Sequence, residues 1–270
     1  MATGEMATGE MTTWDPAQYA AFGDERSRPG VDLIARIPPI APGRVVDLGC
    51  GRGDLAVDLA QRWPAAHVTG MDLSPAMLAD AQARFPKSRF PQIDWVVGDI
   101  DAWTPDAPVD LLFSNAALHW LGDHAGLFPR LMDHVAPGGV LAVQMPNNFA
   151  AASHTVLQAL VADKPWAGRI PTTAPSVLSA DAYWRLLRPA AATIDIWETS
   201  YQHVLTGDDP VLNWVRGTTL RPILSSLRGE EADAFQAAYG AALRDAYPPE
   251  PTGETLFAFR RLFIVARKAE

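Results

Sequence analysis

A buried strand, a glycine-rich turn and a helix follow one another between residues 45 and 60. Residues 45–48, two valines, an aspartate and a leucine, indicate the end of a strand that is covered on both faces. Glycine then occupies every second position from 49 to 53, and residues 54–60 are typical of a helix. Glycine lets the main chain adopt positive φ and lets a ligand approach it closely. This order predicts an α/β fold with a nucleotide-sized crevice at the carboxyl end of the strand.

The spacing of these glycines argues against a dinucleotide. In the dinucleotide fingerprint G-x-G-x-x-G, a pyrophosphate lies at the N-terminus of the helix. Here Asp54 occupies the place of the third glycine, and Asp54 and Asp58 put negative charge into the first turn of the helix. Asp47, just before the turn, would repel an anion but suits a cation such as an α-ammonium group. The pattern D-x-G-x-G-x-G resembles motif I of the Rossmann-like S-adenosylmethionine-dependent methyltransferases. A glycine turn without a ligand is the alternative.

Polar side chains also follow the next three predicted strands. Asp72, Asp99 and Asn115 each come at the end of a short apolar stretch, and the carboxyl ends of parallel strands meet at one edge of a sheet. Asp72 could accept hydrogen bonds from ribose hydroxyls, and Asp99 could accept one from an adenine amino group, with Ile100 against the ring. We therefore expect a cofactor site made of Asp47, Gly49, Cys50, Gly51, Asp72, Leu73, Met77, Asp99, Ile100 and Asn115.

The alternation of short apolar strands with helices up to residue 145 indicates a parallel sheet with right-handed crossovers. We expect an α/β, Rossmann-like fold: a mostly parallel seven-stranded sheet with an antiparallel C-terminal strand and a helical cap insertion. The expected divisions are a disordered extension or tag at 1–11, where five residues repeat; an N-terminal flap and cofactor-binding core at 12–145; a mostly helical cap at 146–250, with a sheet strand near 193–201; and the C-terminal strand at 251–270.

The segment before the first strand predicts a helix from Gly30 to Arg36, which Pro38 ends. Two roles stay open for this flap. It could pack against the edge of the sheet, or it could cover the cofactor with Arg26 or Arg28 directed at an anion.

Charge and cysteine content limit the partners of the chain. Its net charge is −9 and its lysines and arginines are scattered, which argues against nucleic acid or an anionic membrane. No apolar run reaches the roughly 18 residues of a membrane span. The single cysteine, Cys50, allows no internal disulfide, suits a reducing cytoplasm, and is expected to be a small turn residue and not a nucleophile. The histidines do not cluster like metal ligands, so we expect no metal. We expect a cytoplasmic monomer that acts on a small molecule.

Several longer segments resemble one methyltransferase family in particular. The matching segments are Trp14-Asp15-Pro16 with Tyr19, Glu25-Arg26-Ser27-Arg28-Pro29, Val46-Asp47-Leu48-Gly49-Cys50-Gly51, Asp72-Leu73-Ser74-Pro75-Ala76-Met77, Ser114-Asn115-Ala116-Ala117-Leu118-His119-Trp120, Gln144-Met145-Pro146-Asn147-Asn148-Phe149, Asp195-Ile196-Trp197-Glu198-Thr199-Ser200-Tyr201 and Phe259-Arg260-Arg261-Leu262-Phe263. Together they resemble the trans-aconitate 2-methyltransferases, which are class I enzymes. The resemblance extends from Trp14 onward, and Arg52 departs from it because the family often has proline there. It implies methyl transfer from S-adenosylmethionine to a carboxylate of trans-aconitate, which gives a monomethyl ester.

Such a reaction asks for alignment and not for a base. A carboxylate has a reference pKa of about 4 and is already ionised at pH 7. The enzyme must then align oxygen, methyl carbon and sulfur in line and exclude water. His119 and Trp120 are the expected catalytic residues, because they follow the fourth strand tip. Trp120 could face the sulfonium, and His119 could hydrogen-bond the substrate.

The other carboxylates of a tricarboxylate need cations, and arginine matches a carboxylate with two parallel hydrogen bonds. Because side chains alternate along a strand, only one of Arg260 and Arg261 can point inward, and we favour Arg261. The expected substrate-binding residues are Trp14, Tyr19, Arg28, His119, Gln144, Tyr201, Arg221 and Arg261.

Three other functions stay open on the sequence alone. The chain could methylate a different acid, or a carbon or nitrogen acceptor, in which case other arginines of the cap would matter. It could be an NAD-dependent oxidoreductase, which Asp54 argues against. It could also bind a cofactor without catalysis, which the nearly complete set of polar strand tips argues against.

Overall fold

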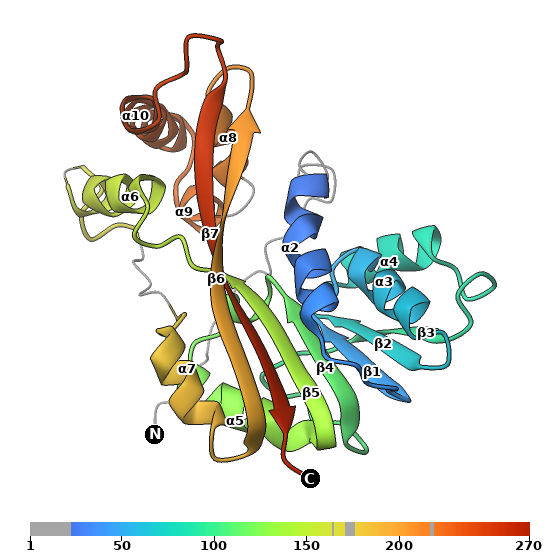
Figure 1. Ribbon diagram of the computed structural model, residues 1–270. Helices are drawn as coiled ribbons and strands as arrows, with labels where there is room; N and C mark the ends of the chain where they lie inside the picture. The colour runs from blue at the N-terminus through green and yellow to red at the C-terminus, as the bar shows by residue number, and fades with distance from the viewer. Residues whose placement is uncertain (1–22, 164, 171–175, 217–218) are drawn as a thin grey trace, which may run out of the picture.

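The computed structural model describes residues 23–163, 165–170, 176–216 and 219–270, and its centre is a seven-stranded sheet (Figure 1). The strands are β1 (Arg44–Leu48), β2 (His67–Asp72), β3 (Ile93–Val97), β4 (Val109–Asn115), β5 (Val135–Pro146), β6 (Ala191–Leu205) and β7 (Thr255–Lys268). Their order in the sheet is β3-β2-β1-β4-β5-β7-β6. Strands β1 to β5 pair in parallel, whereas β7 runs antiparallel to both of its neighbours. The predicted fold class is confirmed.

Helices cover both faces of this sheet. They are α2 (Gly23–Arg36), α3 (Asp54–Arg62), α4 (Pro75–Arg84), the short 3₁₀-helix η1 (Leu118–Trp120), α5 (His124–His134), α6 (Ala152–Ala162), α7 (Ala180–Leu187), α8 (Pro210–Arg216), α9 (Arg221–Ser226) and α10 (Glu230–Ala246). Helices α2 and α3 pack on one face, where Leu33 and Leu59 meet Phe113 of the sheet. Helices α5 and α7 pack on the other face, where Leu131 and Tyr183 join the core. Among the described helices, none is long and apolar enough to cross a membrane.

Helix α2 corrects the predicted start of the flap helix. The prediction began the helix at Gly30, whereas the described helix includes Gly23 and continues through Pro29, although proline inside a helix removes a hydrogen bond. Pro29 and Gly30 are both buried in the packing of this helix. A side chain at position 30 would lie only 2.3 Å from Leu55 of α3, so glycine permits the close approach of the two helices. Tertiary packing thus outweighs the lost hydrogen bond, and the helix ends at Arg36 as predicted.

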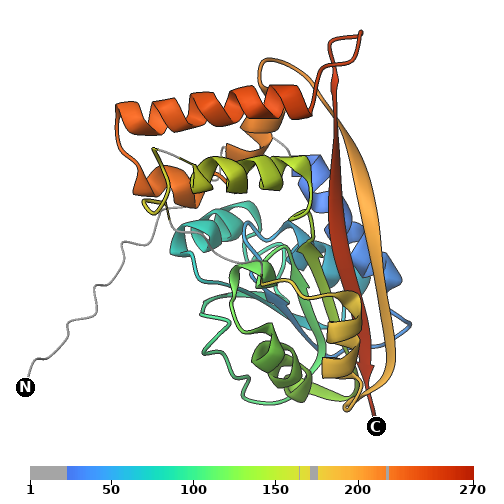
Figure 2. The same cartoon turned by 90° about the vertical axis from the view of Figure 1, so that its left-hand side faces the viewer.

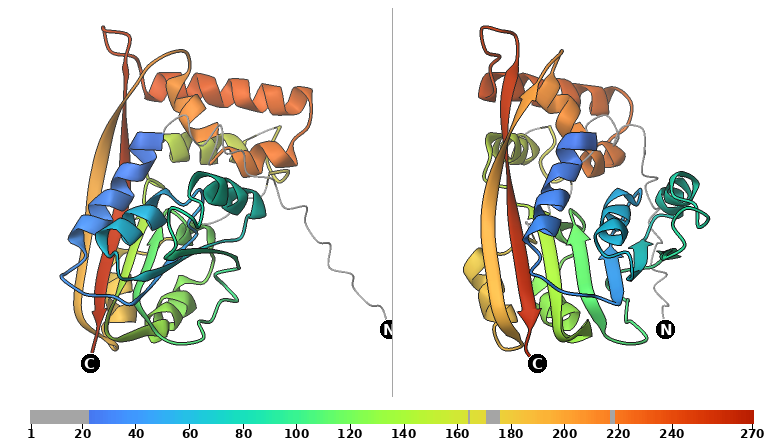
Figure 3. Two further views of the ribbon diagram at one scale, coloured as in Figure 1. Left: turned by 90° about the vertical axis from the view of Figure 1, so that its right-hand side faces the viewer. Right: turned by 45° about the vertical axis from the view of Figure 1, so that its right-hand side comes forward.

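Strands β6 and β7 continue beyond the rest of the sheet as a two-stranded ribbon. Strand β5 pairs with residues 261–267 of β7, whereas β6 pairs with β7 as far as Leu205 and Thr255. Helices α6, α8, α9 and α10 pack on this ribbon around Phe257 and form a separate apolar core, the cap (Figure 2). Because β6 runs in the same direction as β5, the cap lies toward the carboxyl ends of the parallel strands, as both views in Figure 3 show.

The division of the chain at residues 145 and 250 stays a proposal. Within 146–250, α7 and the first part of β6 pack with the central sheet, and only the other helices form the cap. Residues 1–11 lie outside the described residues.

Candidate active site

The three glycines of the turn after β1 all have positive φ, between 54° and 84°. Gly49 and Gly53 are also needed for packing, because a Cβ at either position would lie 2.3 Å from Ala117 or Trp95 respectively. A Cβ at Gly51 would meet nothing within 4 Å, so the main chain there borders open space. The turn is tied to the next strand, because the N–H groups of Gly49 and Cys50 both donate to the carbonyl of Met71. The turn is thus a rigid main-chain edge with room for a ligand above Gly51.

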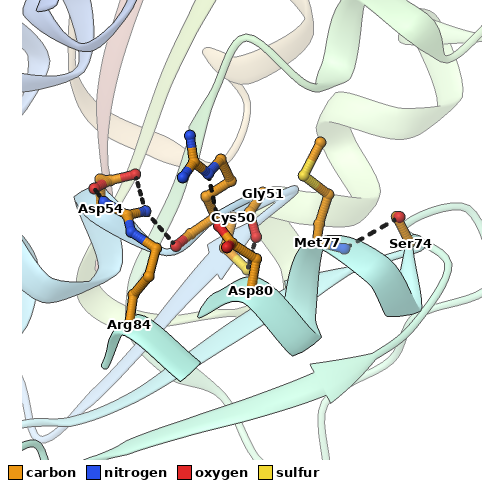
Figure 4. A network of polar contacts seen from close by, with 8 residues as sticks. Cys50, Gly51, Asp54, Ser74, Met77, Asp80 and Arg84 are labelled. Atoms are coloured by element: carbon orange, nitrogen blue, oxygen red, sulfur yellow. Dashed lines mark hydrogen bonds and ion pairs between the residues drawn. The ribbon is translucent and has the colours of Figure 1, made fainter. Parts of the chain in front are cut away.

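A polar network supports this turn from the side of α4 (Figure 4). Arg84 makes two hydrogen bonds to the carboxylate of Asp54, at 2.8 and 2.5 Å, and a third to the carbonyl of Arg52. The guanidinium of Arg52 in turn pairs with Asp80 at 2.7 Å. This network corrects one argument from the sequence. The sequence predicts that Asp54 and Asp58 repel a diphosphate from the first turn of α3, but Arg84 balances the charge of Asp54, and Asp58 lies beyond that first turn. The case against a dinucleotide therefore depends on the glycine spacing.

Two buried acceptors without partners lie at the tips of β1 and β4. Asp47 is 2% exposed, and its Oδ2 has no hydrogen-bond partner among the described residues. Burial, with a smaller contribution from the charge of Asp72, raises the pKa of Asp47 to about 8. The Oδ1 of Asn115 is likewise buried without a partner in the described part of the chain. Because β1 and β4 are adjacent in the sheet, the two acceptors form one region that suits a cationic donor.

The predicted cofactor residues at β2 and β3 lie beside this region. Asp72 Oδ2 accepts the N–H of Gly51 and Oδ1 accepts the N–H of Ser74, both at 2.9 Å, so its carboxylate is held in one orientation. Each oxygen keeps a second lone pair for a ligand hydroxyl. Leu73 is 52% exposed although it is apolar. Asp99 is exposed, and its Oδ1 also accepts the N–H of Asp101. A polar and apolar surface thus lies next to Gly51.

The other cofactor candidates are less accessible. Met77 is buried in the first turn of α4, and its N–H donates to Ser74. Ile100 is partly buried against the core. Burial strongly raises the pKa of the Cys50 thiol, which disfavours the thiolate that a nucleophile would need.

Donors without partners lie on the other side of the predicted crevice, at β5 and the segment that follows it. The Oε1 of Gln144 accepts from Arg261 Nη1 at 3.4 Å, so the amide nitrogen is the atom without a partner among the described residues. Asn148 has the same arrangement, because its Oδ1 accepts the N–H of Arg260 while its buried Nδ2 has no partner in the described chain. Gln144 lies near the carboxyl end of β5 and Asn148 directly follows that strand, and Arg261 on the neighbouring strand β7 is 4% exposed.

His119, on η1 after β4, is a further polar group near Arg261. Its Nδ1 is buried without a partner among the described residues. Burial, followed by the nearby charges of Arg261 and His124, lowers the pKa of His119 to about 3. The ring is therefore neutral at physiological pH and can present a hydrogen at Nδ1 in one tautomer. Trp120 lies beside it, with ring centroids 4.7 Å apart, and is 51% exposed.

Tyr201 and Arg28 lie together, and the guanidinium of Arg28 is placed over the tyrosine ring. The hydroxyl of Tyr201 donates to Asp32 Oδ2 at 2.6 Å, and the guanidinium of Arg28 lies 5.2 Å from the tyrosine ring. The hydroxyl hydrogen is directed to Asp32, so Tyr201 has only its ring and an acceptor lone pair for a substrate. Arg260 lies on the other face of β7 from Arg261 and pairs with Glu198, as strand alternation requires.

Some predicted residues fall outside what the structure describes. Trp14 and Tyr19 lie outside the described residues, and so does the side chain of Arg221, although its main chain begins α9. No group of histidine, cysteine and acidic residues in the described part of the chain is arranged to hold a metal ion.

Three residues were missed by the sequence reasoning. Asn148 follows the tip of β5, the same signal that predicted Asp72 and Asn115. Asp32 is four residues from Arg28, which places both on one face of α2. Arg216 ends α8 in the cap, and its buried Nε has no partner among the described residues. No pattern in the sequence distinguishes Arg216 from other arginines.

Comparison with known proteins agrees with this geometry. Residues 45–139 match the family model "Methyltransferase domain". The trans-aconitate 2-methyltransferase of Streptomyces coelicolor is 50% identical over 266 residues, which cover 96% of this chain and 88% of that protein. The chain belongs to the trans-aconitate 2-methyltransferase family. The member from Methylobacterium radiotolerans is 46% identical and is covered completely, with 96% of this chain aligned.

The fold agrees with a more distant solved structure. Phosphoethanolamine N-methyltransferase 2 of Haemonchus contortus, solved with phosphomonomethylethanolamine and S-adenosylhomocysteine, superposes with a TM-score of 0.55 and 17% identity. The aligned region covers 90% of this chain and 53% of that longer protein, and it shows that the fold is shared.

Proposed function

We propose that this protein transfers the methyl group of S-adenosylmethionine to a carboxylate of trans-aconitate and releases the monomethyl ester. Family membership supports the reaction. The observation in this structure that supports it most is the division of the crevice: buried acceptors without partners lie on the β1–β4 side, and buried donors lie on the β5–β7 side. A ligand pair made of an ammonium-bearing cofactor and a polyanionic acceptor matches this division.

The residues around the glycine turn fit the cofactor. Asp47 and Asn115 would accept hydrogen bonds from the ammonium group, and the fixed carboxylate of Asp72 would accept from ribose hydroxyls. The exposed side chain of Leu73 and the edge of Ile100 would contact the adenine ring, near the acceptor Asp99. S-adenosylmethionine supplies, when bound, a methyl group already activated by a sulfonium.

The β5–β7 side, with its hydrogen-bond donors, fits a polycarboxylate. Arg261 would neutralise one carboxylate, and the amide nitrogens of Gln144 and Asn148 would donate to it or to a second one. A neutral His119 can orient the attacking carboxylate with a hydrogen bond. A protonated histidine would bind the attacking oxygen more strongly and make it less nucleophilic. The acceptor is already ionised, so the protein needs no base, and its contribution is alignment and exclusion of water.

The decisive experiment is incubation with methyl-labelled S-adenosylmethionine and a panel of mono-, di- and tricarboxylates, with products identified by mass spectrometry. We expect label in a base-labile ester of trans-aconitate, and weaker transfer to dicarboxylates. Label on a carbon or nitrogen atom, or a preference for monocarboxylates, would contradict the proposal. A preference for another tricarboxylate would keep the reaction and change the substrate.

We further propose that the enzyme acts as a monomer in the cytoplasm. The single cysteine, which excludes an internal disulfide, supports a reducing compartment. Light scattering coupled to size exclusion would test the monomer, because a dimer would double the measured mass.

A further inference from the structure

His124 is almost completely buried at the start of α5, and both of its ring nitrogens have partners. It is 2% exposed. Its Nε2 lies 2.9 Å from the carbonyl oxygen of Leu118, and its Nδ1 lies 2.5 Å from the hydroxyl of Tyr183 on α7. The mechanism described above uses neither His124 nor Tyr183. This buried histidine, with both ring nitrogens bonded, lies close to the predicted catalytic residues His119 and Trp120.

The chemistry of the partners fixes the direction of these hydrogen bonds. The carbonyl of Leu118 can only accept, so Nε2 must carry the hydrogen. The ring is neutral because burial lowers the pKa of His124, and its Nδ1 is therefore an acceptor. The hydroxyl of Tyr183 donates to that nitrogen, and its oxygen accepts the N–H of Leu178 at 3.1 Å. Each group in this chain of hydrogen bonds thus has one defined role.

This chain of hydrogen bonds ends at the segment that carries the predicted catalytic residues. Leu118 is the first residue of η1, directly before His119 and Trp120. The next carbonyl, that of His119 itself, accepts a hydrogen bond of 2.7 Å from the hydroxyl of Ser176. Two successive carbonyls of η1 are therefore held by α5 and by the segment that leads into α7. The ring of Phe128 packs against both His124 and Tyr183 and keeps the pair in place.

We propose that His124, Tyr183 and Ser176 are positioning residues that hold His119 and Trp120 in line with the acceptor carboxylate. The inference rests on the proposed function, because it takes His119 to contact the substrate. Alignment errors of about 1 Å can cost on the order of 100-fold in rate, so a rigid η1 matters for a reaction whose catalysis is mostly alignment. The cofactor side of the crevice does not include this chain of hydrogen bonds, so its affinity should not depend on them.

Tyr183→Phe tests the proposal because it removes one oxygen and leaves the ring. We expect kcat for trans-aconitate to fall about 10-fold or more, and the Kd for S-adenosylhomocysteine to change less than about twofold. Leu187→Val is the matched control, because Leu187 is fully buried on the same helix and in the same core but has an apolar side chain that forms no hydrogen bond. It should lower the midpoint of thermal unfolding without lowering kcat. An equal loss of kcat in both variants would overturn the proposal, because stability alone would explain it.

Ser176→Ala provides a milder second variant if Tyr183→Phe folds poorly. It removes the bond to the His119 carbonyl from a partly buried site and should lower kcat about threefold to tenfold, whereas Ser176→Thr keeps the hydroxyl and should restore most of the rate. Unchanged kcat in Ser176→Ala would remove Ser176 from the set of positioning residues.

Two further measurements separate this inference from the proposed function. Hydrogen exchange of residues 116–121 should be faster in Tyr183→Phe than in Leu187→Val, and equal exchange would contradict positioning whatever the substrate is. In a double-mutant cycle with His119→Ala, Tyr183→Phe should have little further effect on kcat; fully multiplicative losses would show that the two residues act independently. If the wild-type protein methylates no carboxylate, the proposed function fails, and the exchange experiment still decides whether the chain of hydrogen bonds holds η1.

Discussion

The two sides of the crevice differ in the kind of polar atom that they leave without a partner. On the β1–β4 side, these atoms are the acceptors of Asp47 and Asn115, whereas on the β5–β7 side they include the donors of Gln144 and Asn148. Both sides use the same device, a side chain at or just beyond the tip of a parallel strand. Under the proposed function, the strand tips set the position of each ligand, and the polarity of the atoms left there matches its charge.

This arrangement has a cost in the ligand-free protein. A buried polar group without a partner costs about 1–3 kcal/mol, and more if it is charged. Asp47 illustrates the cost, because its raised pKa means that folding disfavours its ionised form. Under the proposed function, the same groups gain partners when the two ligands bind, which offsets this cost. Variants that alter one side at a time can therefore test whether the two sides serve different ligands.

The largest expected effect is on the β5–β7 side, where the hydrogen-bond donors lie. Arg261→Gln should raise KM for trans-aconitate and lower kcat/KM by about 100-fold to 1000-fold, because it removes the buried cation that we propose neutralises a carboxylate of the substrate. Steady-state kinetics at saturating cofactor would measure it, with calorimetry showing that S-adenosylhomocysteine still binds. Arg260→Gln is the control: it removes the same charge from the adjacent position, on the other face of β7. Comparable losses in both variants would contradict the division into two sides.

The matching change on the β1–β4 side, where the hydrogen-bond acceptors lie, is Asp47→Asn. We expect the Kd for S-adenosylmethionine to rise about 10-fold to 100-fold, which corresponds to a charge-assisted hydrogen bond of roughly 1.5–3 kcal/mol. The KM for trans-aconitate should change much less. The ligand-free variant should also unfold at a higher temperature at pH 8, because it no longer has to bury a carboxylate. Asp58→Asn, on α3, is the control for affinity and should leave the Kd for S-adenosylmethionine unchanged. Unaltered cofactor affinity in calorimetry would remove Asp47 from the site.

The sequence predicted those parts of this division that follow from a single strand and its direction. The strand-tip rule located Asp47, Asp72 and Asn115 because parallel strands must end at the same edge. Strand alternation correctly placed Arg260 and Arg261 on opposite faces of β7. Both rules need only the identity of a strand and its direction.

The errors concern partners that are distant in the sequence. The charge of Asp54 is balanced by Arg84, thirty residues away, and the hydroxyl of Tyr201 is directed to Asp32, 169 residues away. Helix α2 continues through Pro29, and its next residue, Gly30, lies against Leu55 of α3. Neighbouring residues in the sequence do not reveal such distant partners. The charges close to the turn in the sequence therefore gave a wrong estimate of the electrostatic potential around it.

The two sides should also respond differently to pH. Since the pKa of Asp47 is about 8, cofactor affinity should rise toward pH 8, by up to about tenfold per pH unit, as the carboxylate ionises. Folding stability of the ligand-free protein should fall over the same range, from about pH 4 to 8, because the folded state holds a proton there that the unfolded state has lost. With saturating cofactor, kcat should stay flat from pH 6 to 8, because His119, with a pKa of about 3, remains neutral.

Calorimetry in buffers of different ionisation enthalpy would show proton release on cofactor binding at pH 7. Affinity that does not depend on pH would show that Asp47 is already ionised. A sharp fall in kcat below pH 7 would instead indicate a catalytic base on the β5–β7 side.

The smallest expected effect comes from the residue between the two sides. Ala116 has φ of 53°, and its N–H donates to the carbonyl of Gln144, so it joins the tip of β4 to the donor strand β5. A non-glycine residue at positive φ costs about 1–2 kcal/mol, of which glycine would recover part. Ala116→Gly should therefore raise the free energy of unfolding by about 0.5–1 kcal/mol in denaturant titrations.

Both ligand affinities should stay within about twofold in that variant, because the hydrogen bond to Gln144 is made by the main chain. Ala117→Gly is its control: Ala117 has negative φ and packs against Gly49, so the same substitution should destabilise the protein. If Ala116→Gly instead weakened trans-aconitate binding while it stabilised the fold, the strained conformation itself would be part of how β4 and β5 hold their two ligands at a fixed distance.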